Sequence, residues 1–304
     1  MPRIKKSLVI GATGYLGSNL CKILHDNDHF VTGTGRNTEA PIYLQAHNYI
    51  QLDLESQSDL EQLDLEYDYI FLFAAKTGTL NSFENAKEFI SINEIALTNL
   101  LNKISQLSVS PKIIFPSSRL VYKGKDSALV ETDQLYSKTI YARNKISCES
   151  YLSMYSKLYG INYTIFRICI PYGNLVSDNI SYGTIGYFMN CVANNVDISL
   201  FGDGSQKRSF THIEDLCYMI LESLNYNEET NNEIFNIDGE DFSLKDAAGL
   251  FSSHYGVDVK HTDWPDSYKI IESGHTYFNG NKLNSIINYK RKRTLKNWLL
   301  TLNN

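Results

Sequence analysis

Short hydrophobic runs alternate with amphipathic segments through the first half of the chain. Apolar residues at helical spacing predict helices over residues 16–24, 91–105 and 139–158. The run over residues 70–75 is apolar at every position, which is typical of a strand buried on both faces of a parallel sheet. This alternation predicts an α/β fold, a Rossmann-type doubly wound parallel sheet. The predicted strands are residues 8–10, 30–34, 69–73, 112–115 and 163–168.

The rhythm of strands and helices weakens after about residue 170, where Asn, Asp and Gly become more frequent. We therefore predict a Rossmann domain over residues 1–168 and a smaller C-terminal lobe over residues 169–304. A segment near residues 208–238 is expected to return to the first domain. Because open α/β sheets bind ligands beyond the carboxyl ends of their strands, the lobe is expected to hold a substrate over that edge.

Composition narrows the class of protein. The 304 residues carry 28 Lys and Arg against 34 Asp and Glu, a formal net charge of -6, which argues against nonspecific nucleic-acid binding. The five cysteines are scattered without a Cys-x-x-Cys pair, a pattern typical of a reduced, cytoplasmic protein with no metal site. The apolar stretch near the start is too short for a signal peptide or a membrane span, so we expect a cytoplasmic protein without a membrane partner.

Residues 11–17, with the sequence Gly-Ala-Thr-Gly-Tyr-Leu-Gly, form the strongest motif. They follow a predicted strand and open a predicted helix, which is the context in which such a glycine turn binds a dinucleotide. Glycines let the backbone turn tightly and approach the pyrophosphate, whose charge is favoured at the helix N-terminus. The cofactor contacts expected here are Gly11, Thr13, Gly14, Tyr15, Leu16 and Gly17.

The end of the second predicted strand indicates which dinucleotide binds. NAD enzymes usually place an acidic residue there for the ribose 2′-hydroxyl, but this chain has Gly35 followed by Arg36. A guanidinium at that place can pair with a 2′-phosphate, so NADP(H) is favoured and NAD(H) is possible. Asp53 is expected to accept a hydrogen bond from the adenine amino group.

Tyr141 and Lys145 are four residues apart and therefore share one face of a predicted helix. The ammonium charge favours the phenolate, so Lys145 is expected to lower the pKa of Tyr141 towards the range that proton transfer needs. Ser117 and Ser118 follow a predicted strand and lie at the carboxyl edge of the sheet. A hydroxyl there can hold a substrate carbonyl or alcohol beside Tyr141.

With these motifs the chain resembles the extended short-chain dehydrogenase/reductase family of nucleotide-sugar epimerases, dehydratases and reductases. Residues 71–75 resemble the family strand that passes under the nicotinamide, and Ile92-Asn93 resembles the asparagine-bearing helix. Residues 115–122 resemble the serine strand, and residues 201–215 resemble the substrate-lobe signature. The resemblance implies an NAD(P)-dependent enzyme that binds a nucleotide-diphosphate sugar and forms a homodimer.

The resemblance also implies roles for single residues. Ser118, Tyr141 and Lys145 are the expected catalytic residues. Arg208 is expected to meet the substrate diphosphate, with a salt bridge as its alternative role. Further cofactor contacts are expected from Leu54, Ala74, Ala75, Asn93, Tyr141, Lys145 and Ile168. Further substrate contacts are expected from Lys76, Ser117 and Arg119.

Departures from the family pattern narrow the chemistry. Dehydratases of the family place Asp-Glu directly after the catalytic hydroxyl, where this chain has Arg119 and Leu120, so a sugar 4,6-dehydratase is disfavoured. Ile170 stands where many relatives have an asparagine near the diphosphate. Residues 272–275 contain no match to the second diphosphate arginine of some epimerases, which leaves the nucleotide open.

We therefore predict an NADPH-dependent reductase of a nucleotide-linked 4-ketosugar, of the 4-keto-6-deoxyhexose type, in sugar-nucleotide biosynthesis. A net reduction commonly draws on NADPH, whereas an epimerase commonly keeps NAD, so the predicted NADP preference favours the reductase. The alternatives are a nucleotide-sugar 4-epimerase that uses the same three catalytic residues and a non-catalytic dinucleotide-sensing protein.

Overall fold

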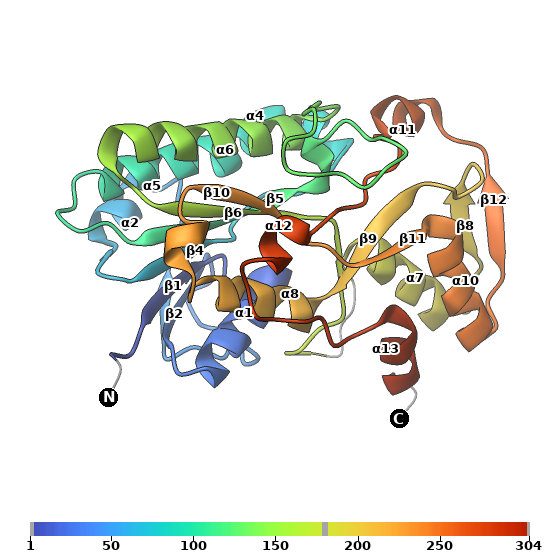
Figure 1. The fold of residues 1–304 in the computed structure, drawn as a ribbon, viewed down its shortest axis with the longest axis horizontal. Coiled ribbons are helices and arrows are strands. Elements are labelled where there is room, and N and C mark those ends of the chain that lie inside the picture. Colours follow the sequence, from blue (N-terminus) through green and yellow to red (C-terminus); the bar gives the residue numbers. More distant parts are fainter. Residues whose placement is uncertain (1–2, 178–181, 303–304) are drawn as a thin grey trace.

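A parallel sheet of seven strands forms the centre of the molecule (Figure 1). The computed structural model describes residues 3–177 and 182–302 of the chain. The strand order is β10-β6-β5-β4-β1-β2-β3, and each neighbouring pair is parallel. The strands are β1 (Lys6–Ile10), β2 (Phe30–Gly35), β3 (Asn48–Gln51), β4 (Tyr69–Leu72), β5 (Lys112–Ser118), β6 (Tyr163–Ile168) and β10 (Glu233–Asn236).

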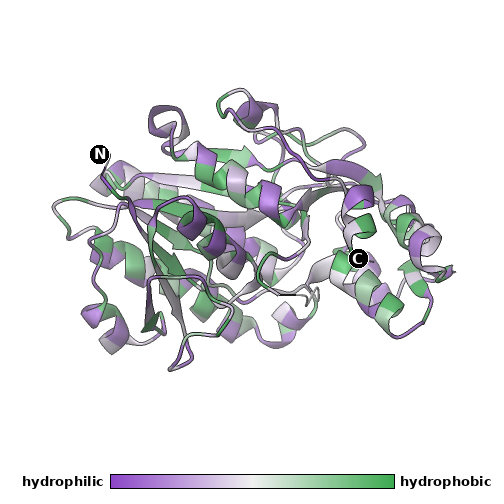
Figure 2. Cartoon of the chain, turned by 90° about the horizontal axis from the view of Figure 1, so that it is seen from below, coloured by the Kyte–Doolittle hydropathy of each residue, from purple (hydrophilic) through white to green (hydrophobic). Residues whose placement is uncertain are grey.

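Helices cover both faces of this sheet, and together they confirm the predicted α/β, doubly wound fold. Phe71 of β4 packs in the core on one face, whereas Ile70 and Leu72 pack in the core on the other, because side chains alternate along a strand. Figure 2 shows green, hydrophobic strands inside helices that carry both green and purple residues. One layer contains α1 (Tyr15–Asp26) and α8 (Ile213–Ser223), and the other contains α2 (Gln57–Gln62), α5 (Ala96–Ile104) and α6 (Ile140–Tyr159).

The second half of the chain builds a smaller lobe at one side of the large sheet (Figure 1). Its core is rich in aromatic residues, with the rings of Phe188 and Phe251 5.3 Å apart. Among the described residues, no helix combines the length and the apolar character needed to cross a membrane. The lobe contains the sheet of β7 (Ile170–Tyr172), β9 (Lys207–His212) and β11 (Glu240–Ser243), the pair β8 (Ile198–Phe201) and β12 (Val259–Thr262), and the helices α7 (Gly183–Ala193), α10 (Leu244–Tyr255), α11 (Asp266–Ile271) and α13 (Leu295–Thr301).

The chain crosses between the two parts more than once. β9 lies inside the segment predicted to return to the first domain, but it pairs with β7 and β11 in the lobe. After β9, α8 packs beside α1, and β10 pairs with β6 at the sheet edge. Leu283 of α12 (Asn281–Asn284) also packs in the α1 and α8 layer. The C-terminal half therefore contributes α8, β10 and α12 to the larger part.

Local sequence signals place α6 against the end of β5. The Thr139 hydroxyl caps the helix by accepting the N–H of Ala142 at 3.1 Å, and Gly160 ends it with a left-handed φ of 71°. Tyr141 therefore lies in the first turn and Lys145 one turn later. The shorter helical segments of the chain are α3 (Asn81–Glu84), α4 (Ala86–Ile90), the π-helix η1 (Ser91–Ile95), the 3-10 helix η2 (Arg119–Val121) and α9 (Asn227–Thr230).

Candidate active site

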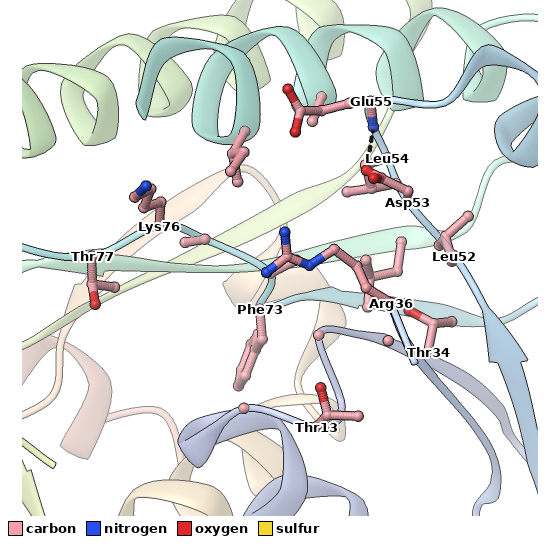
Figure 3. A pocket seen from close by; sticks show the side chains of 18 of the residues that line it. Thr13, Thr34, Arg36, Leu52, Asp53, Leu54, Glu55, Phe73, Lys76 and Thr77 are labelled. Atoms are coloured by element: carbon pink, nitrogen blue, oxygen red, sulfur yellow. Dashed lines mark hydrogen bonds between the residues drawn. The ribbon is translucent and has the colours of Figure 1, made fainter. Parts of the chain in front are cut away.

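A cavity of about 470 Å³ lies at the carboxyl ends of β1, β2 and β4 (Figure 3). The strand order reverses between β1 and β4, and doubly wound sheets bind their ligands at such a switch point. The cavity collects much of the predicted cofactor site. The predicted residues that line it are Gly11, Thr13, Gly14, Arg36, Asp53, Leu54, Ala74, Ala75 and Lys76.

Two glycines of the turn over residues 11–17 are required by close backbone contacts. Gly11 has a φ of +87°, and a Cβ there would lie 2.4 Å from the Ala74 nitrogen. A Cβ at Gly17 would lie 2.2 Å from the Gly11 oxygen. Gly14 is the N-cap of α1 and lines the cavity, so the N-terminus of α1 lies at the cavity. This backbone is suited to a pyrophosphate.

Seven of the predicted cofactor residues do not line the cavity, and three of these, Asn93, Tyr141 and Lys145, are described below; the other four are Tyr15 and three packed residues. The side chain of Tyr15 turns to the lobe: its hydroxyl donates to the Gly173 oxygen at 2.8 Å, and its ring stacks on Tyr182 at 4.7 Å. The other three pack against the core, because they lie within α1 or at the buried end of β6. They are Leu16, Gly17 and Ile168.

Arg36 is exposed, and its guanidinium points into the cavity in Figure 3. The preceding residue explains the missing carboxylate. A Cβ at Gly35 would lie 2.6 Å from Cγ2 of Thr13 and 2.8 Å from the Tyr49 hydroxyl, so packing disfavours any side chain there. The Oδ1 atom of Asp53, which was expected to bind adenine, accepts the N–H of Glu55 at 3.0 Å.

Several residues of the cavity wall were not predicted to contact a ligand. Some adjoin predicted residues in the chain and could have been found by extending each motif by one position. Glu88 had no signal, since only the fold brings its helix to the cavity. The residues that sequence reasoning missed are Ile10, Thr34, Leu52, Glu55, Phe73, Thr77, Glu88, Ile92 and Ala96.

Asn93 lies behind the cavity wall, on the π-helix η1, and is not one of the lining residues. Its Oδ1 accepts the Lys76 N–H at 2.8 Å, and its Nδ2 donates to the Lys76 oxygen at 3.0 Å. Asn93 therefore fixes the backbone of the segment after β4. The side chain of Lys76 forms an ion pair with Glu88 at the cavity, so the predicted substrate residue lies in the cofactor wall.

Ser118, Tyr141 and Lys145 come together where β5 ends against α6. The Ser118 hydroxyl is close enough to the Tyr141 phenol to lower its pKa. The Lys145 ammonium donates to the Pro116 oxygen at 2.7 Å and lies 5.8 Å from the centre of the Tyr141 ring. The structure thus assembles the three predicted catalytic side chains at the carboxyl edge of the sheet.

Burial dominates the titration of both helix residues. Desolvation raises the pKa of Tyr141 above its ordinary value, although the nearby Ser118 hydroxyl and the charge of Arg119 lower it. Desolvation lowers the pKa of Lys145 to about 8. The prediction that Tyr141 has a lowered pKa is therefore wrong, because the loss of water around the phenol outweighs the positive charges near it.

Ser117 faces the opposite side of β5 from Ser118, as alternation along a strand requires. Its hydroxyl donates to Glu149 at 2.5 Å, and Glu149 forms a bidentate ion pair with Arg167 at 2.6 and 3.0 Å. The side chains of Glu149 and Arg167 are 5% and 2% exposed, and we call them the closed pair. The substrate contact predicted for Ser117 is wrong, because its hydroxyl serves this buried network.

Arg208 also forms an ion pair, with Glu272 at 2.7 Å. Its other contacts are backbone oxygens, those of Gly274 at 2.5 Å and Lys207 at 2.8 Å. The Arg208 side chain is 2% exposed but that of Glu272 is 25% exposed, and we call these two residues the open pair. The structure shows the salt-bridge alternative for Arg208, and a diphosphate contact would require Glu272 to share or give up the guanidinium.

Arg119 lies between the catalytic group and the open pair. Its Nη1 donates to the Thr276 hydroxyl at 3.0 Å and to the Ser273 hydroxyl at 3.3 Å. Burial, and then the charge of Arg208, lower its pKa to about 10. Its charge also acts on the phenol of Tyr141. Arg119 is therefore close to both Tyr141 and Arg208.

The sheet, the glycine turn and the serine, tyrosine and lysine group define the class: an extended short-chain dehydrogenase/reductase. Residues 7–238 match the model of the NAD dependent epimerase/dehydratase family, so the chain belongs to that family. The family predicted from the sequence motifs is confirmed.

Two relatives match this chain over most of their length. A putative UDP-glucose 4-epimerase from Methanocaldococcus jannaschii is 27% identical over 259 residues, 82% of this chain and 82% of that protein. A UDP-N-acetyl-alpha-D-glucosaminuronate decarboxylase from Bacillus cytotoxicus is 28% identical over 247 residues, 78% of this chain and 76% of that protein.

A solved structure shares the fold over nearly its whole length. It is UDP-glucuronic acid 4-epimerase from Bacillus cereus, in complex with UDP-glucuronic acid and NAD. The TM-score is 0.84 at 23% identity, and the match covers 97% of this chain and 96% of that chain.

Proposed function

We propose that this chain is a nucleotide-sugar 4-epimerase that keeps its dinucleotide bound through the reaction. The observation that carries the proposal is the grouping of Ser118, Tyr141 and Lys145 where β5 ends against α6, without the acids of a dehydratase at Arg119 and Leu120. The 4-epimerases among the named relatives support this function over the ketoreductase predicted first from the sequence.

The cavity fits a dinucleotide. The close backbone contacts of Gly11 and Gly17 leave room for a pyrophosphate at the start of α1, Arg36 lies at the adenosine end, and the Ala74-Ala75 backbone leads towards the catalytic group. When bound, the dinucleotide supplies a hydride acceptor and donor for the sugar carbon. The protein itself supplies the proton transfer.

Tyr141 is the proton donor and acceptor for the sugar oxygen in this proposal. Its raised pKa keeps the phenol protonated at neutral pH, so Tyr141 can donate a proton to a 4-keto oxygen while Ser118 holds that oxygen. Oxidation of the alcohol needs the reverse transfer. The positive charges of Lys145 and Arg119 favour the phenolate that this step requires.

The second candidate is the NADPH-dependent 4-ketoreductase, favoured by one observation. Gly35 and Arg36 remove the carboxylate that usually binds the ribose 2′-hydroxyl and provide a cation suited to a 2′-phosphate. In that reaction the C4 carbon gains a hydride from NADPH, and the oxygen gains the Tyr141 proton. The NAD in the Bacillus cereus epimerase complex supports the first candidate instead.

Turnover without added cofactor separates the two candidates. We expect the purified protein to carry a dinucleotide, which acid release and chromatography identify, and to interconvert C4 epimers of UDP-sugars as followed by NMR. Tyr141→Phe is expected to lower the rate by about 10²–10⁴-fold. Tyr151→Phe is the matched control, since this α6 tyrosine donates to Glu94 instead. Product formed only with one NADPH consumed per sugar would establish the reductase and overturn the epimerase.

A further inference from the structure

We propose that Arg119 binds a carboxylate on the sugar of the substrate, so that the preferred substrate is a nucleotide-linked uronic acid. This inference rests on the proposed function, because it places the reacting sugar carbon between Ser118 and Tyr141. Arg119 directly follows Ser118 in the chain, at the start of η2.

The guanidinium of Arg119 has no anionic partner among the residues that the structure describes. Nη1 donates to two neutral hydroxyls, those of Thr276 and Ser273. Nε and Nη2 form no hydrogen bond with any described residue, and neither atom is sealed from solvent. Because a guanidinium presents a planar fork of donors, two free N–H groups are suited to a carboxylate.

Arg208, the neighbouring arginine, already has a carboxylate partner in the open pair, so the unpaired cation near Ser118 is Arg119. Arg208 is paired with Glu272 at 2.7 Å, whereas the partly buried Arg119 forms no ion pair with a described residue and is affected by the Glu272 charge only from a distance. A second cation beside it makes the local potential more positive. A ligand anion would relieve this repulsion, and a neutral group would not.

The chemistry of the sugar indicates which group reaches Arg119. In a pyranose that reacts at C4, the neighbouring carbon C5 carries C6, so an anion at C6 lies two bonds from the reacting carbon. Arg119 adjoins Ser118 in sequence, and its charge acts on Tyr141 through space, so we place it beside the reacting end of the sugar. The diphosphate lies at C1, on the other side of the ring, and is the alternative source of an anion.

Direct binding tests the inference without requiring turnover. We would titrate UDP-glucuronate and UDP-glucose, which differ only in the C6 group, into the dinucleotide-loaded protein by calorimetry. We expect the uronate to bind about 10- to 100-fold more tightly, the range that hydrogen bonds to a charged group supply. Arg119→Met should abolish that difference by weakening only the uronate. Arg143→Met is the matched control, since Arg143 is exposed on α6.

Several outcomes would overturn the assignment. Equal weakening of both ligands in Arg119→Met would assign Arg119 to the diphosphate. A wild type that binds both ligands equally, or neither, would remove the uronate preference. If Arg119→Met does not fold, as judged by circular dichroism, Arg119→Lys replaces it and should weaken the uronate alone by about tenfold, since a lysine cannot pair through a fork. Selective binding without C4 epimerisation would sustain this inference while contradicting the proposed function.

Discussion

The closed pair and the open pair use the same two residue types in different surroundings. In each, a strand arginine with 2% exposure meets a glutamate at less than 3 Å. Glu149 of the closed pair is 5% exposed and also accepts from Ser117. Glu272 of the open pair is 25% exposed and follows α11 at the lobe surface.

The difference in exposure separates a structural ion pair from one that a ligand can compete for. Both side chains of the closed pair are almost fully buried, and Arg167 also donates to the Tyr122 hydroxyl at 2.6 Å. In the open pair the carboxylate can be solvated when it leaves Arg208. The same ion pair can therefore stabilise the fold at one place and hold an arginine ready for substrate at another.

Breaking the closed pair is expected to have the largest effect. Arg167→Met leaves Glu149 as a buried, unpaired carboxylate, so the free energy of unfolding should fall by about 3–5 kcal/mol. Urea denaturation followed by circular dichroism measures it. Arg143→Met, on the exposed face of α6, should change it by less than about 0.5 kcal/mol. A loss for Arg167→Met as small as that of the control would contradict the comparison.

Breaking the open pair is expected to affect binding more than stability. In Arg208→Met the carboxylate of Glu272 can turn to water, so the loss of stability should be about half of that for Arg167→Met or less. If Arg208 meets the diphosphate, UDP binding should weaken by about 10- to 100-fold. Denaturation and calorimetry on the same preparation measure both. Unchanged UDP affinity would make Arg208 purely structural.

The pH profile should distinguish the two pairs as well. Lys145 has a pKa lowered to about 8 by burial, and the charge of Glu149 in the closed pair raises it. Because activity needs the ammonium, the rate should fall by about tenfold for each pH unit above 8. Glu149→Gln should move this limb to lower pH. Glu272→Gln should leave it in place, and an equal shift in both variants would contradict the assignment.

The free energy of unfolding should rise with pH over the range in which the reaction rate falls. The unfolded chain keeps Lys145 protonated up to its ordinary pKa of 10.5, whereas the folded protein releases the proton near 8. Between these values the unfolded state binds more protons, so this group makes the protein more stable as pH rises. Urea midpoints at pH 8 and 10, compared between wild type and Lys145→Met, measure the contribution.

Removing the carboxylate of the open pair is expected to have the smallest effect. Glu272→Gln frees Arg208 from its competitor, so UDP should bind about two- to fivefold more tightly at low salt, an effect within the range of a partly exposed ion pair. Calorimetry at two salt concentrations measures the gain. Weaker binding would show that Glu272 orients Arg208 for the ligand rather than competing with it.

The large sheet and its glycine turn could be predicted from sequence because their signals are local. Residues 70–75 are apolar throughout, and the turn over residues 11–17 lies between a strand and a helix. The predicted strand over residues 112–115 was three residues too short, since β5 runs to Ser118. Because Ser117 and Ser118 were not recognised as part of the strand, the alternation of side chains along β5, which points Ser117 into the core, was not predicted.

The substrate side was less predictable because its contacts join distant parts of the chain. Glu272 lies 64 residues after Arg208, and no spacing rule connects them. The pKa of Tyr141 also escaped prediction, because the spacing of Tyr141 and Lys145 reveals their charges but not the burial around them. The π-helix that carries Asn93 has no sequence signal that separates it from an ordinary helix.

The tight packing at Gly35 constrains how this family member can change its cofactor. An Asp at residue 35 would add the carboxylate typical of NAD enzymes, but its Cβ would meet the side chain of Thr13 at 2.6 Å. Thr13→Ala removes the contacts with residue 13 and leaves the glycines of the turn intact, and the Tyr49 hydroxyl, 2.8 Å from the same Cβ, must still move. Because the side chain at residue 13 blocks the one at residue 35, the substitution at residue 13 would have to come first, in natural evolution or in design. The two substitutions therefore form an ordered mutational path.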